Sequence, residues 1–153
     1  MIARVKGLPP NSKGGFHVHE DGICGAEVGQ PQLGSAGGHY DPCPQGQSTP
    51  VDNNHLYYTG DLPNLVVDEE GVGRLTTRTS RFVLQPNHRT SLDDRSGGNN
   101  SGGPGAAVIV HAMEDQGGET SLPGTPGRTN YAGGPRVACG VIDFDGRADE
   151  DDD

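Results

Sequence analysis

The sequence has 153 residues, the usual length of a single domain, and a formal net charge of -10. Because its 11 Lys and Arg residues are outnumbered by 21 acidic residues, the composition argues against nucleic acid and against an anionic membrane surface as partners. The sequence lacks the run of about 20 apolar residues that a transmembrane helix needs, and its opening residues, MIARVKGLPP, lack the apolar run of a signal peptide.

The first half of the chain predicts short β-strands. Residues 2–7 and 15–20 alternate in side-chain type on either side of a Pro-Pro turn, which indicates two strands or one interrupted strand pair. Residues 62–69 and 74–79 are joined by the turn EGVG and predict a hairpin, which residues 81–84 continue. The long Gly- and Pro-rich loop at 21–60 requires a metal ion or a disulfide to order it.

The second half predicts two further strands, at residues 106–112 and 136–144, separated by a second long loop. Helical periodicity is absent, so we expect one all-β domain over residues 1–145. Residues 146–153, GRADEDDD, read as a disordered acidic tail. The high content of Gly and Pro makes disorder throughout the alternative, but the clustering of β-branched residues in short runs argues against it.

Four of the six histidines stand where a metal site could form. His17 and His19, in GGFHVHE, occupy positions i and i+2 of a strand, so both imidazoles lie on one face with Cβ atoms roughly 7 Å apart. His39 follows two glycines that let the backbone approach a site, and His111 ends an apolar strand where an unpaired ring would be costly to bury. Such a set suits copper or zinc, with copper bound more strongly. Exposed or hydrogen-bonded histidines without a metal are the alternative.

The chain resembles the copper,zinc superoxide dismutase family in five segments, which follow one another in the family's order: GFHVHE, SAGGHYDP, TGDLPNL, VIVHA and RVACGVI. The resemblance extends from about Ala3 to Ile142. It implies a Greek-key antiparallel β-barrel, an immunoglobulin-like sandwich, whose two long loops build a metal site. It also implies a copper cofactor and the superoxide anion as substrate, converted to oxygen and hydrogen peroxide by alternate reduction and oxidation of copper.

The resemblance also implies roles for individual residues, with copper bound by His17, His19, His39 and His111. In the family, the histidine matched by His39 bridges copper to zinc, leaves copper on reduction and donates a proton. Arg136 matches the arginine that draws superoxide to copper, and Asp115 matches a carboxylate that orients the ligands of both metals. Cys24 and Cys139 match the family's disulfide, in its bacterial placement. The alternatives are that Arg136 is an ordinary arginine at the end of a strand and that Asp115 is a solvated acid in a loop.

The zinc ligands of the family are only partly present. Its second zinc histidine belongs eight or nine residues after His39, where this sequence has Gln47 and Ser48. His55 and Asp61 remain, but in the spacing H-x5-D instead of H-x2-D. Because zinc normally takes four ligands and three are available, zinc is uncertain and the chain is expected to resemble the copper-only members.

The sequence also departs from the family at its front, because the family has three strands before the segment ARVKGLPP. We therefore expect an N-terminally incomplete barrel with about five of eight strands. Either the chain is a fragment or has a miscalled start, which we favour, or another copy completes the barrel as a homo-oligomer. The expected disulfide favours an oxidising compartment, periplasmic or secreted, and leaves Cys43 as an unpaired thiol.

Two functions from different classes follow. The first is a copper-dependent superoxide dismutase, and the second is a non-catalytic copper-binding domain of the same fold, a metal store or chaperone-like module. Arg136 favours the enzyme, because storage of copper gives no reason to place an anion guide beside the metal. A structural domain without any metal is the third and least favoured hypothesis.

Overall fold

The computed structural model describes residues 1–25, 33–42, 58–85, 88–92, 105–115 and 133–142. Within these ranges the chain forms six strands and one short 3-10 helix: β1 (Ile2–Val5), β2 (Lys13–His19), η1 (Gly34–Ala36), β3 (Asp61–Val67), β4 (Gly73–Thr76), β5 (Ala106–His111) and β6 (Arg136–Ile142). In the described part of the chain, no helix has the length and apolar character needed to cross a membrane. The expected all-β fold is confirmed.

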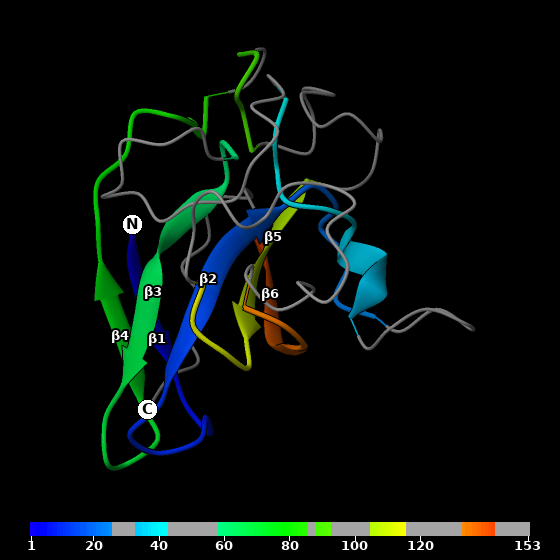
Figure 1. The fold of residues 1–153 in the computed structure, drawn as a ribbon. Helices are drawn as coiled ribbons and strands as arrows, with labels where there is room; N and C mark the ends of the chain where they lie inside the picture. Colours follow the sequence, from blue (N-terminus) through cyan, green and yellow to red (C-terminus); the bar gives the residue numbers. More distant parts are fainter. Residues whose placement is uncertain (26–32, 43–57, 86–87, 93–104, 116–132, 143–153) are drawn as a thin grey trace, which may run out of the picture.

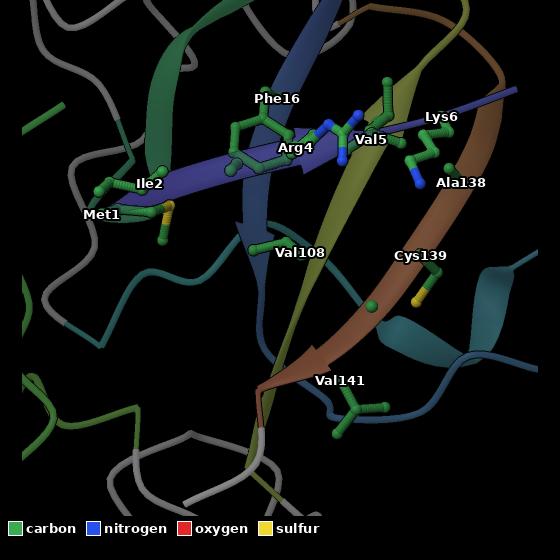
Figure 2. A pocket seen from close by; sticks show the side chains of 13 residues that line it. Met1, Ile2, Arg4, Val5, Lys6, Phe16, Val108, Ala138, Cys139 and Val141 are labelled. Carbon is green, nitrogen blue, oxygen red and sulfur yellow. The ribbon is translucent and has the colours of Figure 1, made fainter. Parts of the chain in front are cut away.

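The strands form one curled, wholly antiparallel sheet, a half-barrel, in the order β1-β4-β3-β2-β5-β6 (Figure 1). Strands β2, β3 and β4 are neighbours in sequence order, and β1 lies beside β4, which is a Greek-key arrangement. The two edge strands of the described sheet, β1 and β6, face each other across a cavity of about 790 Å³ (Figure 2).

The strand predictions are confirmed in most places and wrong in two. The hairpin exists, with Val66 opposite Arg74 in β3 and β4. Residues 81–84 do not continue it, because Val83 makes only an isolated parallel bridge to Ser91. The strands on either side of the Pro-Pro turn do not pair with each other either, since β1 pairs with β4. The described sheet has six strands where about five were expected.

The alternation of side chains along β2 separates the two faces of the sheet. Phe16 and Val18 are buried in the main hydrophobic core, whereas His17 and His19, equally buried, lie on the opposite face. The core is formed by one face of the sheet and by residues of the segments that follow β1, η1 and β4. Its buried members are Leu8, Phe16, Val18, Tyr40, Leu62, Leu65, Val67, Phe82, Leu92, Ala106 and Val110.

The segment after η1 lies against the end of β2 and brings His39 to the sheet. The amide of Glu20 donates to the carbonyl of Gly38 at 3.0 Å, and the amide of Tyr40 donates to the carbonyl of Val18 at 2.9 Å. These two hydrogen bonds flank an isolated antiparallel bridge between His19 and His39. The Tyr40 side chain is buried in the core, and its hydroxyl donates to the carbonyl of Ser91 at 2.8 Å. This contact anchors the segment after η1 to the core.

A disulfide between Cys24 and Cys139 joins the segment after β2 to the last strand, across 115 residues of sequence and with 5.6 Å between the Cα atoms. Cys139 also packs against a small second cluster of buried residues that contains Ala36 of η1 and Ile109 of β5. The disulfide therefore holds η1 and its neighbours close to β5 and β6. Cys43, the expected tail at 146–153 and most of the second long loop lie outside the described residues.

Replacing Cys24 with serine is expected to lower the free energy of unfolding by about 2 to 5 kcal/mol, because a bridge over so long a loop restricts the unfolded chain strongly. Urea denaturation of the oxidised wild type and of Cys24→Ser measures this difference. Cys43→Ser is the matched control and should unfold as the wild type does. Equal stability of the oxidised wild type and Cys24→Ser would contradict a structural role for the bridge.

Candidate metal centre

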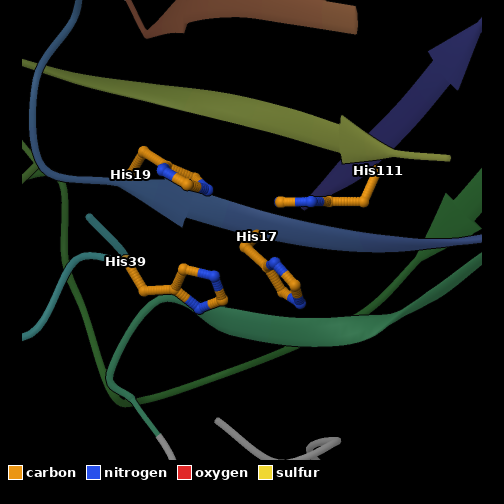
Figure 3. A group of neighbouring side chains, drawn as sticks. All are labelled: His17, His19, His39 and His111. Carbon is orange, nitrogen blue, oxygen red and sulfur yellow. The ribbon is translucent and has the colours of Figure 1, made fainter. Parts of the chain in front are cut away.

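Four histidines from three parts of the fold meet on the outer face of the sheet (Figure 3). His17 and His19 come from β2, His111 from the end of β5 and His39 from the segment after η1. One nitrogen of each ring lies within 4.8 Å of the corresponding nitrogens of the others. The ring centroids of His17 and His39 are 4.1 Å apart, and those of His17 and His111 are 4.8 Å apart. Four imidazoles at such distances can share one ion.

Backbone carbonyls hold two of these rings. His19 Nδ1 lies 3.1 Å from the carbonyl oxygen of Gly37, and His111 Nδ1 lies 2.8 Å from that of Gly134. A carbonyl oxygen can only accept, so each Nδ1 carries the proton and each Nε2 is left with its lone pair. Both Nε2 atoms are buried without a hydrogen-bond partner.

A carboxylate holds the third ring, that of His17, through Nε2 instead of Nδ1. His17 Nε2 lies 2.8 Å from Asp115 Oδ2, and both side chains are buried. His17 therefore donates through Nε2 and keeps its lone pair on Nδ1, which is the third buried imidazole nitrogen without a partner. Unpaired buried polar atoms are rare, and three of them gathered in one place require an explanation. A metal ion bound by these nitrogens would supply it, since lone pairs of neutral imidazoles are what copper and zinc bind.

His39 differs from the other three in its partner and its exposure. Its Nδ1 lies 2.7 Å from Asp61 Oδ1, and its side chain is 11% exposed where Asp61 is fully buried. The ring also stands edge-on to Tyr58, with centroids 5.2 Å apart. Asp61, which the sequence offered as a zinc ligand, thus contacts the imidazole that was expected to bridge two metals. His55, the other candidate zinc ligand, and Gln47 lie outside the described residues.

Burial keeps the imidazoles of His17, His19 and His111 neutral. Desolvation is the largest cause that lowers the pKa of His17 well below its ordinary value, and the nearby His39 and His111 lower it further. Desolvation is also the largest cause that lowers the pKa of His19 to about 2 and that of His111 to about 4. The charges of His39 and Arg136 act in the same direction, and the hydrogen bonds of the two rings to backbone carbonyls act against it. At neutral pH these rings are therefore unprotonated on the nitrogens that face one another, which is the state that binds a metal.

Arg136, at the start of β6, lies close to this cluster. Its guanidinium donates to the carbonyl of Leu33 at 2.7 Å and to the carbonyl of Gly37, the oxygen that also accepts from His19. Burial lowers the pKa of Arg136 from its ordinary value, with Glu20 acting in the opposite sense. The arginine remains charged, because no protein environment brings a guanidinium near neutral pH.

The structure also shows supporting residues that the sequence did not predict. Asn64 of β3 makes two hydrogen bonds to the backbone of Asp115, donating to its carbonyl at 2.8 Å and accepting from its amide at 2.9 Å. Gly37 and Gly133 have φ angles of 71° and 89°, and a Cβ atom on Gly133 would lie 2.5 Å from the Cβ of His111. Asn64 stands inside the segment TGDLPNL, but nothing in that segment indicates a contact with a residue 51 positions away.

The chain matches one family of known proteins. Residues 1–142 match the family model described as copper/zinc superoxide dismutase (SODC). The chain is 31% identical over 140 residues to superoxide dismutase [Cu-Zn] 2 of Aquifex aeolicus, covering 90% of this chain and 68% of the relative. It is 35% identical over 143 residues to superoxide dismutase [Cu-Zn] of Candida glabrata, covering 90% and 75%.

A solved structure has a similar fold. The crystal structure of a SOD-like protein from Bacillus subtilis matches this chain with a TM-score of 0.64 and 26% sequence identity. The match covers 90% of this chain and 77% of that protein.

Replacing Asp115 with asparagine is expected to weaken copper binding by about 10- to 100-fold, because an amide orients the His17 ring less firmly than a carboxylate and makes it a poorer ligand. Asn64 contacts only the backbone of residue 115, so the substitution leaves that anchor in place. Competition with a chelator of known affinity measures the change.

Glu114→Gln is the matched control, because it removes the same charge at the neighbouring position. The Glu114 side chain is exposed and pairs with Lys13. The control variant should bind copper as the wild type does. Equal affinities of Asp115→Asn and Glu114→Gln would show that Asp115 does not support the site.

Proposed function

Because the chain belongs to the copper/zinc superoxide dismutase family, we propose that it is a copper-dependent superoxide dismutase that converts two superoxide anions and two protons into oxygen and hydrogen peroxide. The observation that carries this proposal is the convergence of three unpaired imidazole nitrogens, His17 Nδ1, His19 Nε2 and His111 Nε2, beside a fourth histidine and an arginine. When bound, copper supplies a one-electron acceptor and donor in turn.

The protein's own contribution is to fix the ligand set before the metal arrives. His17, His19 and His111 would hold copper, each through the nitrogen left free by its hydrogen bond to Asp115, Gly37 or Gly134. The rings are buried and already neutral, so binding needs neither their deprotonation nor their reorientation. The burial also excludes most water from the ligands.

His39 is proposed as the fourth ligand and as the proton donor. Formation of hydrogen peroxide requires protons to reach the reduced substrate, and a side chain that passes them must itself contact water. Among the clustered histidines, the Nε2 or Nδ1 atoms of the other three are buried without a partner, whereas the His39 side chain is 11% exposed. The hydrogen bond between His39 Nδ1 and Asp61 holds one edge of this ring and keeps the ring directed at the cluster.

Arg136 is proposed to guide the substrate. The chain carries a net charge of -10, which repels superoxide at long range, so attraction has to come from a local positive group. Arg136 supplies it next to His19, and its two backbone hydrogen bonds keep the guanidinium in a fixed position although the side chain is half-buried.

A location outside the cytoplasm is part of the proposal. The disulfide between Cys24 and Cys139 is compatible with an oxidising compartment, where such bridges persist without continuous re-oxidation.

Arg136→Ala is expected to lower kcat/KM for superoxide by about tenfold or more, because local charges raise the encounter rate of an anionic substrate by that order. Copper-loaded wild type and variant would be compared by pulse radiolysis at low ionic strength. The difference should shrink as salt is added. Arg74→Ala, which removes an exposed charge in the hairpin, is the matched control and should change kcat/KM little.

Two outcomes of this experiment contradict parts of the proposal. If the loaded wild type binds copper through the clustered histidines but shows no activity above that of free copper, the chain is a non-catalytic copper-binding domain. If the wild type is active and both arginine variants lose the same small amount of activity, Arg136 has no special part in guiding superoxide.

We further propose that copper is bound without a partner zinc ion, because the sequence has no histidine at the family's second zinc position. The purified chain loaded with both metals and passed over a weak chelating resin is expected to retain one copper and no zinc, as measured by elemental analysis. One zinc retained per chain, and lost in Asp61→Ala, would overturn this part of the proposal.

A further inference from the structure

The ring of His39 is held by a short turn that leads into β3. Nδ1 of His39 donates to Asp61 Oδ1 at 2.7 Å, and Asp61 Oδ2 accepts from the amide of Tyr58 at 3.3 Å. The amide of Asp61 donates to the carbonyl of Tyr58 at 3.1 Å, which closes a turn over residues 58–61. The position of the His39 ring therefore depends on how firmly this turn is held.

One arginine side chain joins the two ends of the turn. Arg81, in the segment after β4, donates through Nη1 to the carbonyl of Tyr58 at 3.0 Å and through Nη2 to the carbonyl of Asp61. These carbonyls belong to the first and the last residues of the turn. A guanidinium presents its N–H groups in a fixed planar fork, so two carbonyls bound by one fork are kept at a fixed separation. A lysine, with one ammonium group on a flexible stem, has no such fork.

Tyr58 and Asp61 also contact the His39 ring through their side chains. The Asp61 carboxylate accepts from the ring, and the Tyr58 ring stands edge-on to it with centroids 5.2 Å apart. Arg81 therefore binds the backbone of both residues that support His39 from the turn. A shift of either end of the turn would displace a neighbour of this imidazole.

Arg81 is itself fixed in place. Its backbone amide and its Nε atom both donate to the hydroxyl of Thr79, at 3.1 and 3.2 Å. The next residue, Phe82, is buried in the main hydrophobic core and anchors the backbone beside Arg81. The Arg81 side chain thus connects the turn at 58–61 to the core.

The segment after η1 holds the middle of the same turn. Asp41 accepts from the amide and the hydroxyl of Thr59 at 3.3 and 2.9 Å. The amide of Gly60 donates to the carbonyl of Tyr40 at 2.7 Å. These contacts position the two central residues of the turn. Loss of the Arg81 guanidinium is therefore expected to loosen the ends of the turn and to leave its middle attached.

We propose that Arg81 is a positioning residue for the metal centre: it fixes the ends of the turn at 58–61, and through Asp61 and Tyr58 it fixes the ring of His39. This role of Arg81 rests on the proposed function, in which His39 is the fourth copper ligand and the proton donor. The rings of the other three clustered histidines are held by different groups, namely Asp115 and the carbonyls of Gly37 and Gly134. Loss of the fork should therefore disturb one ring of the four.

Proton exchange in the metal-free, disulfide-bonded chain tests this link. The exchange rates of the His39 Nδ1 proton and of the His17 Nε2 proton are measured by NMR on isotope-labelled histidine. Arg81→Lys and Arg81→Gln are expected to speed exchange of the His39 proton by about tenfold or more, because the carboxylate that accepts it is no longer held. The His17 proton, held by Asp115, should exchange as in the wild type.

Arg78→Gln is the matched control, because it removes the same charge from an exposed side chain of the same segment. It should leave both protons unchanged. Exchange of the His39 proton at the wild-type rate in both Arg81 variants would overturn the proposal. Equal acceleration of the His17 and His39 protons, or loss of the native histidine signals in Arg81→Lys, would also overturn it, because Arg81 would then support the whole fold.

The reduction potential of the copper-loaded chain supplies a second readout. Because His39 Nδ1 donates to Asp61, only Nε2 can bind copper, and this nitrogen must be free of copper when it carries a proton. His39 is therefore expected to bind Cu(II) and not Cu(I). Arg81→Lys should weaken Cu(II) binding by about tenfold and leave Cu(I) binding unchanged, which raises the one-electron reduction potential by about 59 mV.

Chelator competition for each copper ion and a redox titration measure these changes, with Arg78→Gln again as the control at the wild-type potential. An unchanged potential in Arg81→Lys, or equal weakening of Cu(II) and Cu(I) binding, would contradict a selective effect on His39. The proposed function fails separately. A wild-type chain that binds copper without dismutating superoxide is no dismutase, whereas the exchange of the His39 proton still shows whether Arg81 holds that ring.

Discussion

The alternation of side chains along β2 is the constraint on which the rest of the structure depends. Four consecutive residues of this strand serve two purposes, because Phe16 and Val18 fill the core while His17 and His19 enter the metal centre. A slip of one residue would exchange these faces, placing imidazoles in the core and apolar side chains in the site. Pairing with β3 on one side and β5 on the other fixes the register, so that the packing of the hydrophobic core also positions two of the proposed metal ligands.

The unpaired nitrogens of the site lower the stability of the chain without a metal ion. Each buried imidazole nitrogen without a partner destabilises the fold by about 1 to 3 kcal/mol, and the described residues contain three of them. The chain tolerates this because Asp115, Gly37 and Gly134 satisfy the other nitrogen of each ring. Coordination of an ion removes the remaining penalty, so metal binding and folding stability are coupled, and the native rings need little rearrangement to accept the ion.

The residues alone predicted the parts of the fold and site that depend on local patterns. Long-range contacts were predicted only where the family resemblance implied them, as for the disulfide between Cys24 and Cys139 and the grouping of the four histidines. The i, i+2 spacing of His17 and His19 required only that their segment be a strand. The pairing of β1 with β4 was not predictable in this way, because short strands of similar composition carry no signal for their partner. Likewise, the ring positions of His19 and His111 depend on backbone oxygens, which any residue could supply, and Asn64 reaches Asp115 only in the folded sheet.

The carbonyl of Gly37 accepts from both His19 and Arg136, and so one oxygen atom links a proposed copper ligand to the arginine that is proposed to guide superoxide. Because this oxygen belongs to the backbone, no side-chain replacement can delete it, and the link survives sequence drift at the positions around it. The exception is Gly37 itself, whose φ of 71° excludes most other residues and whose missing Cβ leaves room for Glu20. Evolution can therefore retune the metal end or the substrate end of this centre separately only by altering the path of the backbone.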